Sequence, residues 1–146
     1  MYVIDTNLYI RALRNPAFAT ELESFQRTAL ARLWLSAVVI FEVMVGALSD
    51  AHTDAFERWL VRPFHSRNRV LVPDAASWRL VARMEREIRS MGGFDRKLQQ
   101  RSFLNDMLIA ATCRQTGATL LTANSADFEL LNRVVGVRHL PHFPSL

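Results

Sequence analysis

The stretch Met1-Tyr2-Val3-Ile4-Asp5-Thr6-Asn7 decides how this chain is interpreted. Tyr2 to Ile4 is a short apolar run with two β-branched residues, which is typical of a buried strand. The acid, hydroxyl and amide that follow are turn and capping residues, so a helix is expected to begin there. Catalytic groups of open α/β sheets gather at the carboxyl ends of parallel strands. Asp5 therefore lies where a functional site is expected.

Two further acids interrupt apolar segments with helical character. Glu42 lies within the run from Val38 to Val45, and Asp106 lies within the run from Phe103 to Ile109. A buried carboxylate without a partner costs several kcal/mol. Together with Asp5, these acids are best explained if they meet around something cationic.

Each acid, taken alone, also has an ordinary explanation. Asp5 suits the N-cap of a helix, and Asp106 suits a first helical turn, where the backbone dipole favours negative charge. Glu42 suits the edge of an amphipathic helix, from which its carboxylate reaches solvent. The joint pattern of three acids carries the hypothesis of a shared site.

Oxygen-only ligands point to a particular class of metal. Carboxylates suit Mg²⁺ or Mn²⁺, which can activate a bound water and neutralise charge on a phosphoryl oxygen. Without the ion, clustered carboxylates repel one another and at least one pKa should rise. The sequence contains neither of the glycine-rich phosphate-binding motifs, GxxxxGK[ST] or GxGxxG.

Length and composition predict one ordinary globular domain over residues 1–146. Half of the residues are hydrophobic and 22% are charged. The longest apolar run, Leu33 to Leu48, is shorter than the roughly 20 residues of a membrane helix and contains Glu42. No signal peptide is recognised, and the single Cys113 excludes an internal disulfide framework. We expect a cytoplasmic protein that does not enter the membrane.

The basic residues leave two interpretations open. The net charge is +4 and the pI is about 10.2, which is compatible with a polyanionic partner. Of the 18 basic residues, 17 are Arg, which suits phosphate recognition, although codon bias gives the same composition. Solvated helix faces are the alternative for the candidate phosphate-positioning residues, which are Arg11, Arg14, Arg79, Arg83 and Arg86.

Short apolar runs alternate with longer amphipathic ones along the chain. The predicted strands cover residues 2–5, 33–36, 69–73 and 118–122, and residues 134–137 lead into a last edge strand. The predicted helices cover residues 7–13, 17–31, 37–48, 53–61, 74–91 and 102–115, and a short helix begins at residue 124. Residues 94–100 are predicted as a polar connection. This alternation indicates an α/β fold with a mainly parallel sheet and helices on both faces.

The chain resembles PIN-domain ribonucleases, specifically the VapC-type toxins of toxin–antitoxin pairs. The first motifs of the resemblance are Val3 to Asn7, and Ser36 followed by Glu42 and Gly46. The later ones are Asn105-Asp106 with Ile109 to Ala111, and Gly117 to Asn124 before Asp127-Phe128. The resemblance implies a three-layer α/β/α sandwich whose acids bind Mg²⁺ or Mn²⁺ and hydrolyse RNA, often tRNA or rRNA. It also implies a VapB-like antitoxin partner and a homodimer.

The resemblance assigns roles by position. Asp5, Glu42 and Asp106 match the core acids, and Thr6 and Thr122 match hydroxyl positions near the metal. Asp5 and Asp106 would hold the ion directly or through water. Glu42 would help to hold it and would orient or deprotonate the attacking water. Hydrolysis would leave a 3′-hydroxyl and a 5′-phosphate.

One position departs from the family's frequent pattern. A fourth acid, 18 residues after the third, is replaced here by Asn124. Asn124 can still offer a carbonyl oxygen or bind a metal water, but the lost charge should weaken a second ion. We therefore expect one firmly held metal. Asp127, three residues on, is either a further metal ligand or a cap of the last helix.

Three other functions compete with the ribonuclease. A phosphatase of the haloacid dehalogenase type also begins with a strand ending in Asp, but it needs a second Asp where Asn7 stands. A receiver-like signalling domain needs a late Lys, whereas the only lysine is Lys97. A PIN domain without activity, which binds only RNA or protein, is left open by Asn124.

Overall fold

The computed structural model describes residues 1–145 and is built around a five-stranded sheet. The strand order is β3-β2-β1-β4-β5, and every pairing is parallel. The strands are β1 (Tyr2–Ile4), β2 (Leu33–Ser36), β3 (Val70–Leu71), β4 (Thr119–Leu121) and β5 (Arg138–Leu140). The first strand is therefore the central one, and Asp5 follows its carboxyl end.

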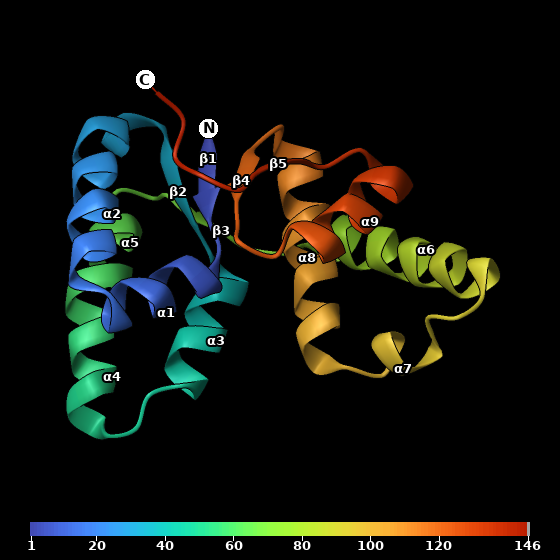
Figure 1. Cartoon of the computed structure of the whole chain (residues 1–146), viewed down its shortest axis with the longest axis horizontal. Coiled ribbons are helices and arrows are strands. Elements are labelled where there is room, and N and C mark those ends of the chain that lie inside the picture. The colour runs from blue at the N-terminus through green and yellow to red at the C-terminus, as the bar shows by residue number, and fades with distance from the viewer. Residues whose placement is uncertain (146) are drawn as a thin grey trace.

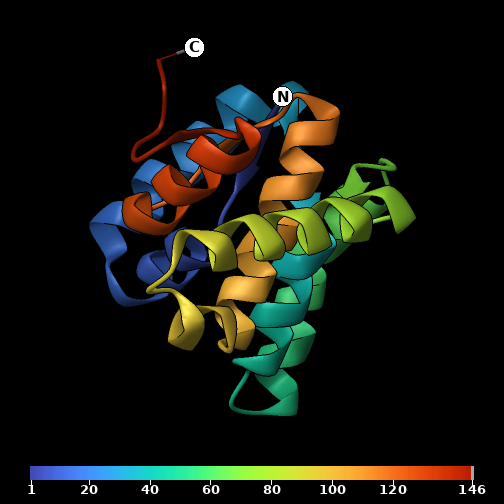
Figure 2. The same ribbon diagram turned by 90° about the vertical axis from the view of Figure 1, so that its right-hand side faces the viewer.

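Helices cover both faces of this sheet (Figures 1 and 2). The elements on one face are α1 (Thr6–Arg14), α2 (Pro16–Ala29), η1 (Leu30–Arg32), α3 (Ala37–Val45), α4 (Asp50–Phe56), η2 (Glu57–Val61) and α5 (Arg62–His65). Those on the other face are α6 (Ala75–Met91), α7 (Asp95–Leu98), α8 (Arg101–Thr116) and α9 (Ser125–Val135). The predicted α/β/α sandwich with a parallel sheet is confirmed.

The central strands and helix α8 form the middle of the core. Val3 and Ile4 of β1 are buried on opposite sides of the sheet, as expected for a parallel strand covered on both faces. Phe103 of α8 and Phe128 of α9 are among the largest fully buried side chains. Each such side chain contributes about 1.5–3 kcal/mol through burial. This packing fixes the helices that carry the acids.

Local sequence signals explain most helix ends. Asn15 caps α2, and its side-chain oxygen accepts a hydrogen bond from the backbone N–H of Phe18 at 3.1 Å. Asp74 and Ser77 form a reciprocal capping box at the start of α6, in which each side chain accepts a hydrogen bond from the backbone N–H of the other residue. Gly117 ends α8 with a φ of 70°, a conformation that favours glycine.

Several predicted boundaries are wrong. The helix predicted over residues 53–61 begins at Asp50 and continues as helical turns through η2 to His65. Pro63 lies at the start of α5, two residues after the π-helical turn η2, and the helical turns continue past it. The predicted polar connection at 94–100 contains the short helix α7, and the last helix is longer than expected, reaching Val135. Only Val70 and Leu71 of the third predicted strand pair with β2.

The most apolar helix, α3, has only nine residues. A bilayer-spanning helix needs about 20. Within residues 1–145, no helix combines the length and apolar character required to cross a membrane.

Candidate active site

Asp5 is held at the junction of β1 and α1. It is 3% exposed and serves as the N-cap of α1. Its carboxylate accepts hydrogen bonds from the backbone N–H of Thr6 at 2.7 Å, the side-chain amide of Asn7 at 2.7 Å and the hydroxyl of Thr122 at 2.6 Å. These donors fix the orientation of a buried acid that would otherwise be costly.

Thr122 connects the two neighbouring central strands. It is fully buried just beyond β4, and its hydroxyl oxygen accepts from the amide of Asn7 and from the backbone N–H of Asn124, both at 3.0 Å. The side-chain oxygen of Asn7 also accepts from the backbone N–H of Ala123 at 3.1 Å. The segments after β1 and β4 are thus joined by Thr122, which is predicted to lie near the site, and by Asn7.

Glu42 lies on α3 and points inward between α1 and α8. Its carboxylate accepts from the hydroxyl of Thr6 and from the side-chain amide of Asn105 at 3.0 Å. It is half-buried. The alternative of a glutamate turned out to solvent is therefore wrong.

Asp106 lies on α8 and is close enough to the other acids to feel their charge. Burial raises the pKa of Asp106 to about 8, and the charges on Asp5, Asp127 and Glu42 add to this rise, while Lys97 opposes it. Burial likewise raises the pKa of Asp5 to about 6; the hydrogen bond from Thr122 lowers it and the charge on Glu42 raises it further. The acids predicted to meet do lie together.

Asn124 and Asp127 belong to the same group of side chains. The amide of Asn124 donates to Asp106 at 3.2 Å and to Asp127 at 3.0 Å. The N-cap of α9 is Asn124, and Asp127 is paired instead with the ammonium group of Lys97. Asp127 thus lies beside the acids. It is not the N-cap of α9, which is Asn124.

Sequence patterns do not identify three residues of this site. Lys97 lies in the predicted polar connection, and Asn7 and Asn105 enter only as parts of motifs. No periodicity or spacing in the sequence relates Lys97 to Asp127, which lies 30 residues away. A helical model of residues 102–115 could have placed Asn105 beside Asp106, but not its contact with Glu42.

The donor chemistry of the group fits a hard divalent cation. Asp5, Glu42 and Asp106 offer carboxylate oxygens. The pKa of Asp106 is raised mainly by burial and further by the charges on neighbouring acids, and a dication would favour its ionised form. Over residues 1–145, however, no three His, Cys, Asp or Glu side chains are arranged so that they could hold a metal ion together. Threonine and asparagine donors engage the carboxylates instead.

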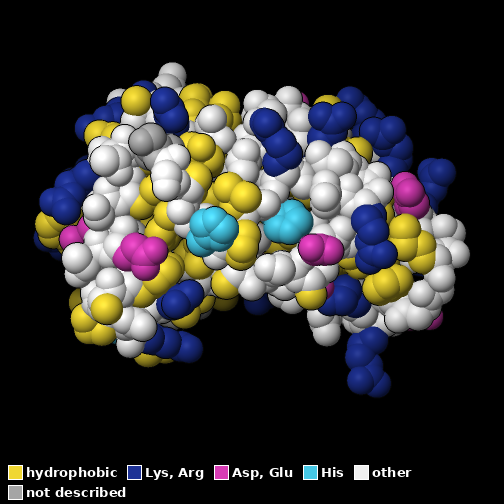
Figure 3. Space-filling model, turned by 45° about the horizontal axis from the view of Figure 1, so that its top comes forward, with side chains coloured by type: hydrophobic (Ala, Val, Ile, Leu, Met, Phe, Trp, Pro, Cys, Tyr) yellow, Lys and Arg dark blue, Asp and Glu magenta, His cyan; other side chains and the backbone are white. Residues whose placement is uncertain are grey.

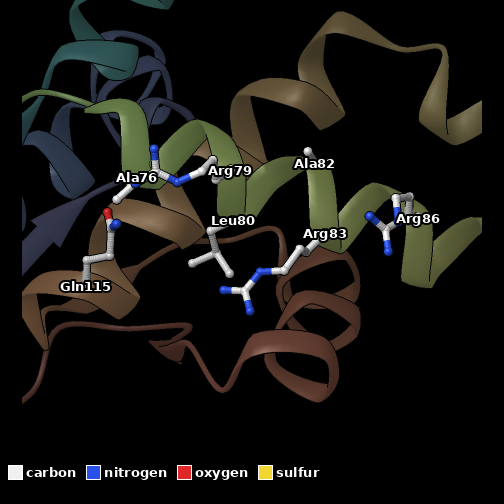
Figure 4. A pocket seen from close by; sticks show the side chains of 7 residues that line it. All are labelled: Ala76, Arg79, Leu80, Ala82, Arg83, Arg86 and Gln115. Atoms are coloured by element: carbon white, nitrogen blue, oxygen red, sulfur yellow. The ribbon is translucent and has the colours of Figure 1, made fainter.

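The candidate phosphate-positioning arginines do not line this group. Arg79, Arg83 and Arg86 border a separate open hollow of about 670 Å³ along α6, together with Gln115 of α8 (Figure 4). The guanidinium of Arg11 lies 4.2 Å from the ring centre of Phe18. Lys and Arg side chains lie at several separate places on the face seen in Figure 3. Phosphate contacts by these arginines stay a prediction.

The pattern of acids on a parallel sheet can be compared with known proteins. The family model of the PIN domain matches residues 2–133. The chain belongs to the PIN-domain family. PIN domains are generally nucleases. A comparison with curated proteins finds no match.

Solved structures with the same fold cover almost the whole chain. FitAB bound to an IR36 DNA fragment is 22% identical, with a TM-score of 0.72 over 96% of this chain and 94% of that one. FitAcB from Neisseria gonorrhoeae is 24% identical, with a TM-score of 0.65 over 96% of each chain. DNA-bound VapBC from Salmonella typhimurium is 21% identical, with a TM-score of 0.67 over 95% and 96%. At this identity, the likeness concerns the fold.

Proposed function

We propose that this PIN domain is a metal-dependent endoribonuclease and the toxin of a toxin–antitoxin pair. The observation that carries the proposal is a hydrogen-bond network that connects the surroundings of the three acids, Asp5 after β1, Glu42 on α3 and Asp106 on α8. The links run through Thr6, Thr122, Asn105 and Asn124. Oriented carboxylates of this kind serve phosphodiester hydrolysis, and PIN domains are generally nucleases.

The proposed cofactor is Mg²⁺ or Mn²⁺. Asp5, Glu42 and Asp106 would hold the ion, with Asn124 or Asp127 as a further oxygen donor. When bound, the ion would supply Lewis-acid chemistry by acidifying a water and neutralising charge on the scissile phosphate. One ion is proposed, because Asn124 brings no charge of its own.

The chain's own residues have separate tasks in this proposal. Thr122 and Asn7 keep the carboxylate of Asp5 in one orientation through hydrogen bonds of 2.6 and 2.7 Å. Thr6 and Asn105 do the same for Glu42. Glu42 orients the attacking water and takes its proton as the water oxygen bonds to phosphorus. The bond between phosphorus and the 3′ oxygen breaks, and the leaving oxygen takes a proton from solvent water, which leaves a 3′-hydroxyl and a 5′-phosphate.

The proposed setting follows from the fold relatives. VapBC and FitAB share this fold, so we propose a VapB-like antitoxin partner and a homodimer of the toxin. The proposed substrate is tRNA or rRNA, met in the cytoplasm. The whole chain, residues 1–146, would act as one domain.

The second candidate is a PIN domain that binds RNA or protein without cleaving. Two observations favour it: Asn124 stands in place of a fourth acid, and the acids are engaged by neutral donors such as Asn105. Another Mg²⁺-dependent phosphoesterase is the remaining alternative.

The decisive experiment incubates purified, partner-free protein with total RNA in Mg²⁺, Mn²⁺ or EDTA. Discrete, metal-dependent cleavage is expected, and Asp5→Asn and Glu42→Gln should abolish it. Glu21→Gln is the matched control, because Glu21 is an exposed acid on α2. Mapping the ends of the fragments would give the target.

Either alternative gives a different result in the same experiment. A general phosphoesterase would hydrolyse p-nitrophenyl phosphate and leave the RNA intact. Intact RNA in every condition, with a folded protein that binds Mg²⁺ in calorimetry, would overturn the nuclease and favour the binding module.

A further inference from the structure

A groove of about 400 Å³ is lined by Glu42, one of the acids of the candidate active site. Thr6 and Asn105, which donate hydrogen bonds to Glu42, also line it. Its lining further includes the apolar side chains of Phe41 and Val45 and the cationic side chain of Arg101. Its volume lies within the range of about 300–1,000 Å³ that is usual for small-ligand sites.

Phe41 presents an aromatic surface to solvent at this place. Its side chain is 44% exposed, although it directly precedes the inward-pointing Glu42 on α3. Phe41 does not belong to the buried core, so packing does not require an aromatic ring there. The guanidinium of Arg101 lies 5.7 Å from the centre of the ring, which brings a planar cation to the same surface.

We propose that this groove holds an unpaired nucleobase of the RNA, stacked on Phe41, next to the phosphate that is cleaved. The inference rests on the proposed nuclease function and adds to it a base subsite formed by Phe41 and Arg101. Proteins read such RNA by stacking splayed bases on aromatic rings or on Arg planes. Arg101 neutralises the adjoining phosphate or covers the base.

A second hollow borders the same aromatic ring. It measures about 260 Å³ and shares Phe41 and Asn105 with the groove. Its lining includes Trp78, which is 51% exposed. Two exposed aromatic rings that line neighbouring hollows suit successive bases of one strand.

The combination of aromatic and cationic groups favours RNA over a protein segment. An apolar peptide would pack against Phe41 and Val45, but it would leave Arg101 without a counter-charge. A nucleotide satisfies both, because its base is planar and its phosphate is anionic. Glu42, one of the acids proposed to act on the phosphate, lines the same groove.

The test uses the full chain in an Asp106→Asn background, so that bound RNA stays intact. The probes are a short single-stranded RNA of mixed sequence and an abasic oligonucleotide with the same ribose-phosphate chain, both measured by fluorescence anisotropy in Mg²⁺. Phe41→Ala should weaken binding of the normal RNA by about 5- to 100-fold and leave the abasic one unchanged. Phe41→Trp should retain binding.

Trp59→Ala is the matched control, because Trp59 is an exposed aromatic that lines a different hollow. It should bind both probes like the parent protein, and circular dichroism should find every variant folded. If Phe41→Ala binds each probe with the same affinity as its parent, the base site is overturned. The groove would then be better explained as a binding site for a protein segment. A parent that binds neither probe would overturn it as well.

Cleavage by the chain with Asp106 intact is measured separately. If that protein never cleaves RNA, yet binding depends on Phe41, the nuclease proposal fails and the base site stands. If it cleaves, but Phe41→Ala binds and cleaves normally, the base site fails and the nuclease stands.

Discussion

The side-chain amide of Asn124 donates a hydrogen bond to the carboxylate of Asp106 at 3.2 Å. The same amide donates to Asp127 at 3.0 Å. One neutral side chain therefore bridges two acids on different helices at the position where related PIN domains frequently carry a fourth acid. The bridge reduces repulsion between acids without adding a charge.

Asn124→Asp should lower the stability of the metal-free protein and raise its affinity for Mg²⁺. The new carboxylate would lose both donated hydrogen bonds and repel Asp106 and Asp127, so the melting temperature in EDTA should fall. Mg²⁺ should bind more tightly and restore more of the stability than it does in the parent protein. Differential scanning fluorimetry in EDTA and in Mg²⁺ measures both effects.

Asn132→Asp is the control for this change, because Asn132 is exposed on the same helix, α9. It should leave the response to Mg²⁺ unaltered. A lower Mg²⁺ response in Asn124→Asp than in the parent protein would contradict a metal site beside Asn124.

The raised pKa of Asp106 makes the metal-free protein less stable as the pH rises. Because the folded-state pKa of about 8 exceeds the ordinary value of 3.8, folding favours the protonated acid. This stabilisation is complete below about pH 4 and is lost as the pH rises through about 8. Asp106→Asn should therefore unfold like the parent at low pH, and be more stable by a few kcal/mol at about pH 9.

Urea unfolding in EDTA across this pH range measures that difference. Asp54→Asn, at an exposed position of α4, is the control and should shift stability little at any pH. Saturating Mg²⁺ should stabilise the parent more than Asp106→Asn. If the difference in unfolding free energy between Asp106→Asn and the parent does not change with pH, the pKa of Asp106 is not raised in the folded protein.

Thr122 should contribute through its hydroxyl rather than its shape. Thr122→Val keeps the volume but removes the donor to Asp5 and the acceptor for Asn7 and Asn124, all inside a fully buried position. Unfolding free energy should fall by about 1–3 kcal/mol. Thr122→Ser restores the hydroxyl and should recover most of the loss, which urea denaturation can measure. Equal stability of the Val and Ser variants would argue against the hydroxyl.

The sequence predicted those parts of the fold that depend on local signals. The strand from Tyr2 to Ile4 and the helix that begins after Asp5 follow from strand propensity and capping, which act over a few residues. The three acids were predicted to meet, since an acid in an apolar run needs a partner. Parallel topology then brought the elements together.

Other features depend on contacts that no local pattern encodes. The pairing of Lys97 with Asp127 needs the fold of α7 against α8 and α9, and α7 itself has only four residues. The extension of helical turns through Pro63 depends on where η2 ends. The groove proposed to hold a base depends on the contact between Phe41 of α3 and Arg101 of α8. Tertiary packing decides all three.

Lys97 places a positive charge beside the acids and should compete with a metal ion. Its ammonium group pairs with Asp127, and its charge lowers the pKa of Asp106 against the effect of burial. Lys97→Gln should therefore lower the unfolding free energy of the metal-free protein and tighten Mg²⁺ binding. Calorimetry measures both effects. Arg96→Gln removes the same charge from an exposed neighbour and should alter affinity much less. Weaker Mg²⁺ binding in Lys97→Gln than in Arg96→Gln would instead mean that Lys97 supports the ion by holding Asp127 in place.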